Sequence, residues 1–193
     1  MRRLVRKLYM TRKLNIDKNW TLFLDRDGVI NEKRENDYVK NWSEFSFTYG
    51  ALEAISKLST TFGKIIVVTN QRGVGKGIMT ELQLISIHSE LTKAVNQTGG
   101  RIDKIYYCTD ILDTSEDRKP NIGMATKAKI YFPEIDFRKS IMIGDSKIDM
   151  EFGKKLNMYT IYISKMVLET GLFKLVDYKC DSLFHATKLL INS

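Results

Sequence analysis

Residues 21–29 read TLFLDRDGV, a short apolar run that ends abruptly in two closely spaced carboxylates. Such a run, bounded by a polar turn, is typical of a strand buried in a parallel sheet. Similar runs recur along the chain and alternate with longer segments of helical period. This alternation predicts an α/β fold, a Rossmann-like three-layer sandwich built on a mainly parallel sheet.

The pattern predicts at least five strands and five helices. The expected strands are residues 21–24, 64–69, 102–108, 140–143 and 160–163. The expected helices are residues 51–59, 80–98, 124–131, 148–156 and about 182–190. Residues 80–83 (TELQ) read as a capping box that opens the longest helix, with Leu82, Ile85, Leu91 and Val95 expected on its buried face.

The net charge of +8 is unevenly distributed along the 193 residues. Residues 1–18 hold seven Lys or Arg and one Asp, whereas the rest of the chain holds 24 basic and 22 acidic residues. We therefore expect a basic, solvated N-terminal arm over residues 1–18, followed by one domain over residues 19–193. The arm leaves contact with nucleic acid or anionic lipid open, but the nearly neutral remainder argues against a nucleic-acid partner.

No apolar run has the length of a membrane span or of a signal peptide, so we expect a cytoplasmic protein without a membrane partner. Cys108 and Cys180 lie far apart, without a CxxC pattern or a neighbouring His. A disulfide framework or a cysteine-rich zinc site is therefore not expected. We expect a monomer or a small homo-oligomer.

Polar segments follow the predicted strands at the edge where ligands collect in open α/β sheets. These segments are residues 25–29 (DRDGV), 69–73 (TNQRG), 118–120 (RKP) and 144–149 (GDSKID). Together they place the carboxylates of Asp25, Asp27 and Asp145 beside Lys119 and Thr69. A hard cation such as Mg²⁺ would relieve the repulsion between three carboxylates.

The four segments, in this order, resemble the four motifs of the haloacid dehalogenase (HAD) superfamily of phosphohydrolases. The motifs are LDRDGV, VVTNQ, RKP and IGDSKIDM, and the match runs from about residue 21 to residue 163. Within the superfamily, DRDGVIN and TNQRGVGKG are most similar to the branch of histidinol-phosphate and heptose-bisphosphate phosphatases. The resemblance implies a HAD-like fold without a large cap domain.

The resemblance implies a role for each carboxylate. Asp25 would attack phosphorus and form a transient aspartyl phosphate, and Asp27 would serve as general acid and base. Mg²⁺ would be held by the carboxylates of Asp25 and Asp145 and by the backbone carbonyl of Asp27. Asp149 would support the metal shell or Lys119.

The resemblance also implies which residues hold the phosphate. Thr69 and the backbone of Asn70 would bind the phosphoryl oxygens, and Lys119 would supply a fixed positive charge. Arg118 is expected to bind a substrate oxygen or a second phosphate.

Four further features have a structural interpretation, either beside a functional one or in place of it. Residues 73–77 (GVGKG) lack the spacing of a phosphate-binding loop and are expected to form a flexible flap that does not open a helix. Lys76 in this flap is either a contact to a sugar phosphate or a solvated lysine. Tyr38 either reaches the substrate or packs under its own loop, and His88 is expected to be a packing or surface residue.

The expected function is Mg²⁺-dependent hydrolysis of a phosphate ester on a small phosphorylated sugar, in particular D-glycero-D-manno-heptose 1,7-bisphosphate. A histidinol-phosphate phosphatase and a nucleic-acid 3′-phosphatase are the alternatives among enzymes. A phosphosugar-binding protein without turnover is the alternative outside enzymes, and the presence of both Asp25 and Asp27 argues against it.

The stretch before the RKP segment departs from that branch, in which Cys and His residues hold a structural zinc. Residues 108–117 (CTDILDTSED) offer one cysteine and no histidine, whereas a closed tetrahedral site needs four ligands. We therefore predict no structural zinc and a shorter loop over the site.

Overall fold

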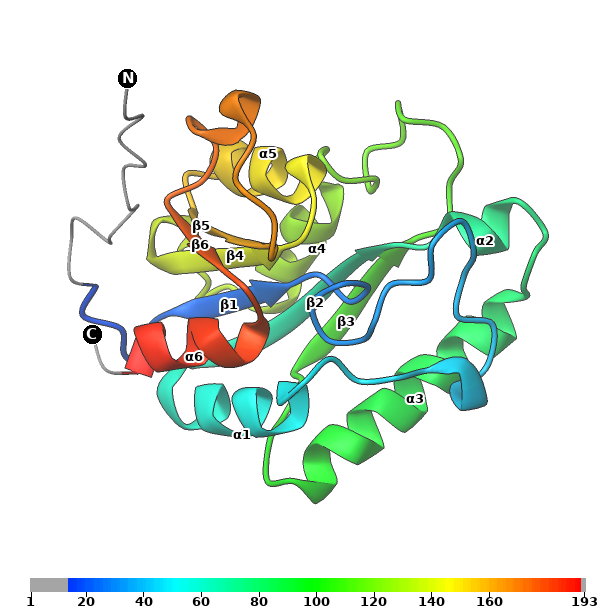
Figure 1. Cartoon of the computed structure of the whole chain (residues 1–193), viewed down its shortest axis with the longest axis horizontal. Helices are drawn as coiled ribbons and strands as arrows, with labels where there is room; N and C mark the ends of the chain where they lie inside the picture. Colours follow the sequence, from blue (N-terminus) through cyan, green and yellow to red (C-terminus); the bar gives the residue numbers. More distant parts are fainter. Residues whose placement is uncertain (1–13, 192–193) are drawn as a thin grey trace.

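A six-stranded parallel sheet forms the centre of the molecule, as seen in the computed structural model, which describes residues 14–191 (Figure 1). The strand order is β3-β2-β1-β4-β5-β6, and all five neighbouring pairs are parallel. The strands are β1 (Thr21–Leu24), β2 (Lys64–Asn70), β3 (Lys104–Cys108), β4 (Ser140–Gly144), β5 (Tyr159–Ile163) and β6 (Tyr178–Cys180). The central position of β1 places the residues that follow it in the middle of one sheet edge.

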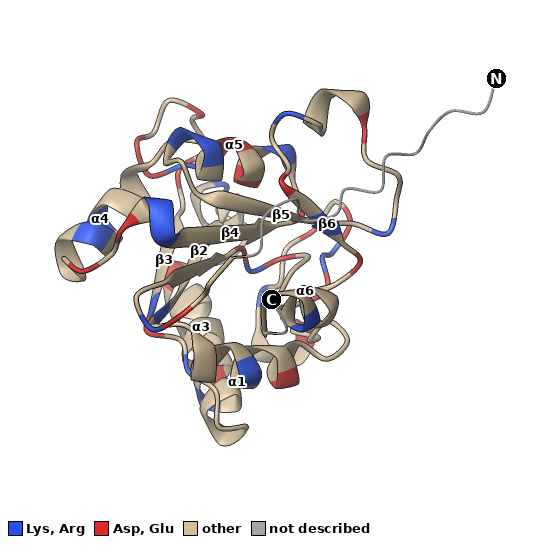
Figure 2. Ribbon diagram, turned by 90° about the vertical axis from the view of Figure 1, so that its left-hand side faces the viewer, with Lys and Arg blue, Asp and Glu red and all other residues tan. Residues whose placement is uncertain are grey.

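Helices cover both faces of this sheet. They are α1 (Ala51–Thr61), α2 (Arg72–Gly75), α3 (Glu81–Gln97), α4 (Gly123–Tyr131), α5 (Lys147–Lys155) and α6 (Leu183–Ile191). Single 3-10 turns occur at η1 (Trp42–Glu44), η2 (Phe137–Lys139) and η3 (Thr170–Leu172). Viewed along the sheet, α4 and α5 lie above the strands, and α1, α3 and α6 lie below them (Figure 2). The predicted three-layer α/β sandwich is confirmed.

Each central strand contributes to two hydrophobic cores because successive side chains point to opposite faces of the sheet. In β1, Leu22 and Leu24 belong to the core under α1 and α6, whereas Phe23 belongs to the core under α4 and α5. All three side chains are fully buried. Burial on both faces explains why β1 is a continuous apolar run instead of an alternating one.

The structure corrects three details of the prediction. A sixth strand, β6, was not predicted, because three residues at a sheet edge leave no pattern in the sequence. Leu82 and Ile85 are exposed, and the buried stripe of α3 instead runs through residues 84, 87, 88, 91 and 95. Residues 73–77 were not expected to open a helix, but Arg72–Gly75 form the short helix α2 one residue after β2.

Part of the predicted basic arm packs against the domain. Leu14 is buried in the main core, and Lys18 Nζ donates hydrogen bonds to the carbonyl oxygens of Ser59 and Phe62 at 3.0 and 3.3 Å. Residues 1–13, the rest of that predicted arm, lie outside the described residues.

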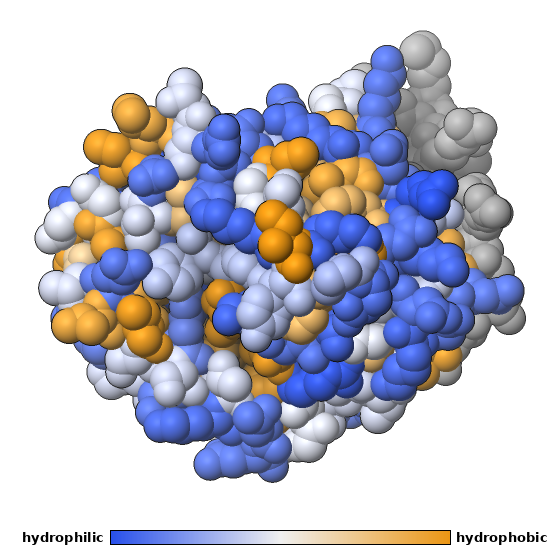
Figure 3. Space-filling model, turned by 180° about the vertical axis from the view of Figure 1, so that it is seen from behind, coloured by the Kyte–Doolittle hydropathy of each residue, from blue (hydrophilic) through white to orange (hydrophobic). Residues whose placement is uncertain are grey.

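The surface is mainly hydrophilic where Figure 3 shows it, and its apolar residues lie in small groups between polar ones. Within residues 14–191, no helix is both long and apolar enough to cross a membrane.

Candidate active site

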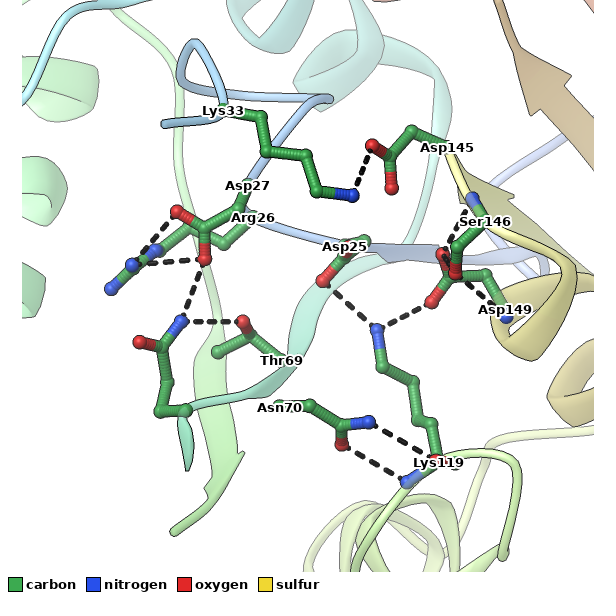
Figure 4. A network of polar contacts seen from close by, with 11 residues as sticks. Asp25, Arg26, Asp27, Lys33, Thr69, Asn70, Lys119, Asp145, Ser146 and Asp149 are labelled. Carbon is green, nitrogen blue, oxygen red and sulfur yellow. Dashed lines mark hydrogen bonds and ion pairs between the residues drawn. The ribbon is translucent and has the colours of Figure 1, made fainter. Parts of the chain in front are cut away.

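The carboxyl ends of β1, β2 and β4 bring the predicted site residues together (Figure 4). They surround a pocket of about 210 Å³. The pocket is lined by Asp25, Asp27, Lys33, Thr69, Asn70, Arg118, Lys119, Asp145, Ser146, Ile148 and Asp149. The four sequence segments therefore meet in space as predicted, although they are spread over more than 120 residues of the chain.

Lys119 lies at the base of this pocket with a side chain that is 2% exposed. Its Nζ donates hydrogen bonds to Asp25 Oδ1 at 2.9 Å and to Asp149 Oδ1 at 2.6 Å. Burial would lower the pKa of Lys119, but the two carboxylates outweigh it and raise the pKa above its ordinary value. Lys119 is therefore a permanent positive charge in a buried position.

Asp25 is a buried carboxylate that lines the pocket beside Lys119. Burial, opposed by Lys119 and reinforced by the neighbouring carboxylates, raises the pKa of Asp25 to about 7. A second cation beside Asp25 would lower this pKa and favour the ionised form.

Asp27 is held by three side chains. Arg26 Nη2 donates to both of its oxygens at 2.9 Å, Asn31 Nδ2 donates to Oδ1 at 2.9 Å, and Gln71 Nε2 donates to Oδ2 at 2.8 Å. Burial alone would raise the pKa of Asp27, but these donors, Arg26 foremost, hold the pKa below its ordinary value. Gln71 also donates to Thr69 Oγ1 at 2.8 Å, so the DxD turn and β2 share one hydrogen-bond network.

The Asn70 side chain fixes the segment that carries Lys119. Its Nδ2 donates to the carbonyl oxygen of Lys119 at 3.1 Å, and its Oδ1 accepts from the backbone N–H of Lys119 at 3.0 Å. This pair of bonds to the backbone of a residue 49 positions away aligns β2 with the loop before α4. The Asn70 side chain therefore positions Lys119.

Asp145 reaches the pocket from the end of β4, close to the turn after β1. The φ angle of Gly28 is +85°, and a Cβ at this position would lie 2.2 Å from Asp145 Oδ2. Glycine is required here both by the left-handed backbone and by the close approach of the carboxylate. Lys33 Nζ contacts the same oxygen at 2.9 Å, and burial outweighs this contact to raise the pKa of Asp145.

The donor set fits a hard divalent cation. Ligand atoms of Asp25, Asp145 and Asp149 lie within 4.8 Å of one another. Asp149 uses both oxygens elsewhere, one on Lys119 and one on Ser146, whereas Asp145 Oδ1 is buried without a hydrogen-bond partner. A buried carboxylate oxygen without a donor is costly unless a cation binds it. The geometry therefore favours Asp25 and Asp145 as ligands, with Asp149 supporting Lys119.

Arg118 is buried at the rim of the pocket and is paired with a residue of the loop that precedes it. Its Nε donates to Asp113 Oδ1 at 2.9 Å, and Arg72 Nη2 contacts the same oxygen. Asp113 itself is 83% exposed in its side chain. Two guanidinium groups thus converge on one exposed carboxylate, which a competing anion could displace.

Two predicted residues lie outside the pocket. The ring of Tyr38 packs against Gly73, where a Cβ would lie 2.8 Å from the ring. This contact agrees with a packing role for Tyr38 and not with a substrate contact. Lys76 Nζ lies 5.8 Å from the centroid of that same ring. Lys33 and Gln71, in contrast, were given no role from the sequence. Gln71 stood within the TNQ motif, whereas nothing in the pattern marked Lys33.

The stretch predicted to lack zinc contains the buried residue Cys108. Its Sγ lies 3.8 Å from Asp110 Oδ2 and 3.7 Å from Ser115 Oγ. Among the residues that the structure describes, Asp25, Asp145 and Asp149 form the group with metal-binding geometry. The absence of a structural zinc stays a prediction.

The sequence model of the polynucleotide kinase 3 phosphatase family matches residues 20–160, which include every carboxylate of the pocket. The chain belongs to this family of HAD-type phosphatases. It is accordingly a phosphatase with a HAD-like fold, as the four motifs predicted. HAD phosphatases use Mg²⁺, in agreement with the donor set described above.

Curated relatives carry a more specific name. A D-glycero-alpha-D-manno-heptose-1,7-bisphosphate 7-phosphatase from Mycobacterium bovis is 39% identical over 133 residues, 68% of this chain and 70% of that protein. A D-glycero-beta-D-manno-heptose-1,7-bisphosphate 7-phosphatase from Photorhabdus laumondii is 33% identical over 180 residues, 89% of each protein. The similarity thus extends over most of the chain.

A solved structure of a heptose bisphosphate phosphatase is similar to this chain in fold. The D,D-heptose 1,7-bisphosphate phosphatase of B. bronchiseptica, complexed with magnesium and phosphate, superposes with a TM-score of 0.78. It is 25% identical, and the alignment covers 90% of this chain and 98% of that one.

Proposed function

We propose that this phosphatase hydrolyses the 7-phosphate of D-glycero-D-manno-heptose 1,7-bisphosphate through an aspartyl-phosphate intermediate. The observation that carries the chemistry is the juxtaposition of Asp25 with Lys119 and with the unpartnered oxygen of Asp145. The names of the relatives support the substrate. Both the alpha and the beta anomer occur among those names, so either anomer is a substrate to be tested.

The first half-reaction is attack of a carboxylate oxygen of Asp25 on phosphorus. The bond from phosphorus to the sugar oxygen breaks, and Asp27 gives its proton to that oxygen. Asp27 is ionised before substrate binds; the negative charge of the bound phosphate raises its pKa, and Asp27 takes up from solvent the proton that it then gives to the sugar oxygen. Lys119 compensates the charge that spreads over the phosphoryl oxygens, and Thr69 and the backbone N–H of Asn70 bind them.

In the second half-reaction, water attacks the phosphorus of the aspartyl phosphate. Asp27, now ionised, accepts a proton from that water, and inorganic phosphate leaves while Asp25 is restored as a carboxylate. The hydrogen bonds from Arg26, Asn31 and Gln71 stabilise the ionised state that this step needs.

Mg²⁺ bound to Asp25, Asp145 and the backbone carbonyl of Asp27 would screen the charge between the nucleophile and the phosphate. Because Lys119 would bind the phosphate that is transferred, the second phosphate of a bisphosphate needs another positively charged side chain, located away from Lys119. Arg118 fits this need because it lines the pocket and already binds an exposed carboxylate, Asp113.

The test is a panel of phosphate esters assayed with Mg²⁺ and with EDTA. It contains both anomers of the heptose bisphosphate, histidinol phosphate and an oligonucleotide with a 3′-phosphate. We expect the highest kcat/KM on a heptose bisphosphate, loss of activity in EDTA, and no turnover by the Asp25→Asn variant, which keeps the shape but not the nucleophile. A preference for the oligonucleotide, or equal rates with EDTA, would contradict the proposal.

A further inference from the structure

A buried chain of contacts connects helix α3 to the DxD turn. Arg26, which lies between the two aspartates, is 1% exposed, and its Nη1 lies 3.1 Å from Nε2 of His88 on α3. The other terminal nitrogen, Nη2, donates to both oxygens of Asp27 at 2.9 Å. Arg26 thus contacts His88 on one side and Asp27 on the other.

The direction of these hydrogen bonds is determined by chemistry. A guanidinium group only donates, so Nε2 of His88 must be the acceptor and the ring proton must lie on Nδ1. Burial and the charge of Arg26 lower the pKa of His88 to about 3, which keeps the ring neutral and able to accept. The His88 ring in turn packs against Tyr107 of β3, with the ring centroids 5.5 Å apart.

We propose that His88 is a positioning residue for the phosphatase reaction: it accepts from Arg26 and thereby fixes the guanidinium group that orients the Asp27 carboxylate. This inference rests on the proposed role of Asp27 as the proton donor to the leaving sugar oxygen. His88 touches neither substrate nor metal ligands and acts only through Arg26.

The geometry requires such an anchor. Arg26 Nε is buried without a hydrogen-bond partner, so the contacts of the two terminal nitrogens are what hold the guanidinium group in place. Without the acceptor on His88, Nη1 also becomes a buried donor without a partner. The guanidinium group then gains by rotating toward another acceptor, and both of its bonds to Asp27 are lost in that rotation.

The test compares two substrates that differ in their need for a proton donor. Departure of a sugar oxygen needs general-acid catalysis, whereas departure of p-nitrophenolate needs almost none. The ratio kcat/KM includes only the steps up to departure of the leaving group, so it reports on the first half-reaction alone.

For His88→Phe we expect kcat/KM to fall about tenfold on heptose 1,7-bisphosphate and less than about twofold on p-nitrophenyl phosphate. The Phe ring keeps the packing against Tyr107 but has no acceptor. His88→Gln places an amide oxygen near the position of Nε2, and we expect it to keep at least about half of the parent value on both substrates. His185→Gln, at an exposed histidine of α6, is the matched control and is expected to match the parent.

Equal losses on both substrates, no loss in His88→Phe, or a loss in His88→Gln as large as in His88→Phe would each overturn the proposal. A measurement on the parent protein tests the hydrogen-bond direction independently of the variants. In ¹⁵N-histidine NMR, with His185→Gln used for assignment, we expect His88 to show a proton on Nδ1 and none on Nε2 from pH 5.5 to 8.5. A protonated Nε2 would overturn the proposal even if the parent hydrolyses neither substrate.

Discussion

Lys119 Nζ lies between Asp25 Oδ1, at 2.9 Å, and Asp149 Oδ1, at 2.6 Å, and all three side chains are at most 12% exposed. Two buried carboxylates therefore share one buried cation. Asp149 holds Lys119 in place from the N-terminal turn of α5, where its other oxygen caps the helix through Ser146. The cation that we propose to serve the reaction is thus also part of the structural support of α5.

The first prediction concerns the removal of this cation. Lys119→Met leaves two buried carboxylates without a positive partner, and loss of a buried partner costs about 3–5 kcal/mol in the free energy of unfolding. The double variant Lys119→Met with Asp149→Asn removes one of those charges and should recover part of this loss. Urea denaturation of both variants measures the effect. A Lys119→Met protein as stable as the parent would show that the charge pairing does not stabilise the fold.

The second prediction concerns Mg²⁺ binding and pH. Because the pKa of Asp25 is raised to about 7, the free protein must lose a proton from this carboxyl group before the metal binds. The apparent affinity for Mg²⁺ should therefore rise about tenfold from pH 6 to pH 8, read as the concentration that gives half of the maximal rise in Tm. Asp25→Asn has no such proton to lose and should show a smaller dependence. Equal affinity at both pH values in the parent would contradict the prediction.

The third prediction uses a pair of glycines in the same backbone region. Gly28 has a φ angle of +85° and faces Asp145, whereas Gly77 has a φ angle of +69° and open space around it. Replacement by Ala costs about 1–2 kcal/mol of backbone strain at either position. Gly28→Ala should in addition displace Asp145, lower kcat/KM about 100-fold and abolish the rise in Tm with Mg²⁺. Gly77→Ala should keep both properties, and equal behaviour of the two variants would refute the argument.

The proximity of the four motifs could be predicted from the sequence because parallel strands bring their carboxyl ends to the same edge of the sheet. Asp25, Thr69 and Asp145 each follow or end an apolar run, so their proximity required only the correct strand type. Lys119 lies in a loop, and its position became predictable through the resemblance of the RKP segment to a known motif.

The unpredicted features depend on tertiary packing. Leu82 and Ile85 fit a helical period as well as Leu84 and Ile87 do, and only the docking of α3 decides which pair is buried. The contact between Arg26 and His88 joins residues 62 positions apart that belong to no common motif. A single histidine within an apolar stripe resembles a packing residue until its neighbour is known.

The last prediction concerns His88 and the dependence of stability on pH. The pKa of His88 is about 3 in the folded chain and about 6.5 when unfolded, so the unfolded chain binds more protons between these values. Stability due to neutral His88 is therefore complete above about pH 6.5 and is lost as the pH falls, by about 2 kcal/mol at pH 5.

His88→Gln keeps an acceptor for Arg26 without a group that titrates in this range. The free energy of unfolding of this variant, measured with urea at pH 7 and pH 5, should fall by about 2 kcal/mol less than that of the parent. His185 lies on the exposed surface of α6, and His185→Gln is the matched control, expected to reproduce the pH profile of the parent. Parallel pH profiles for His88→Gln and the parent would mean that His88 accepts a proton in the folded chain as readily as in the unfolded one.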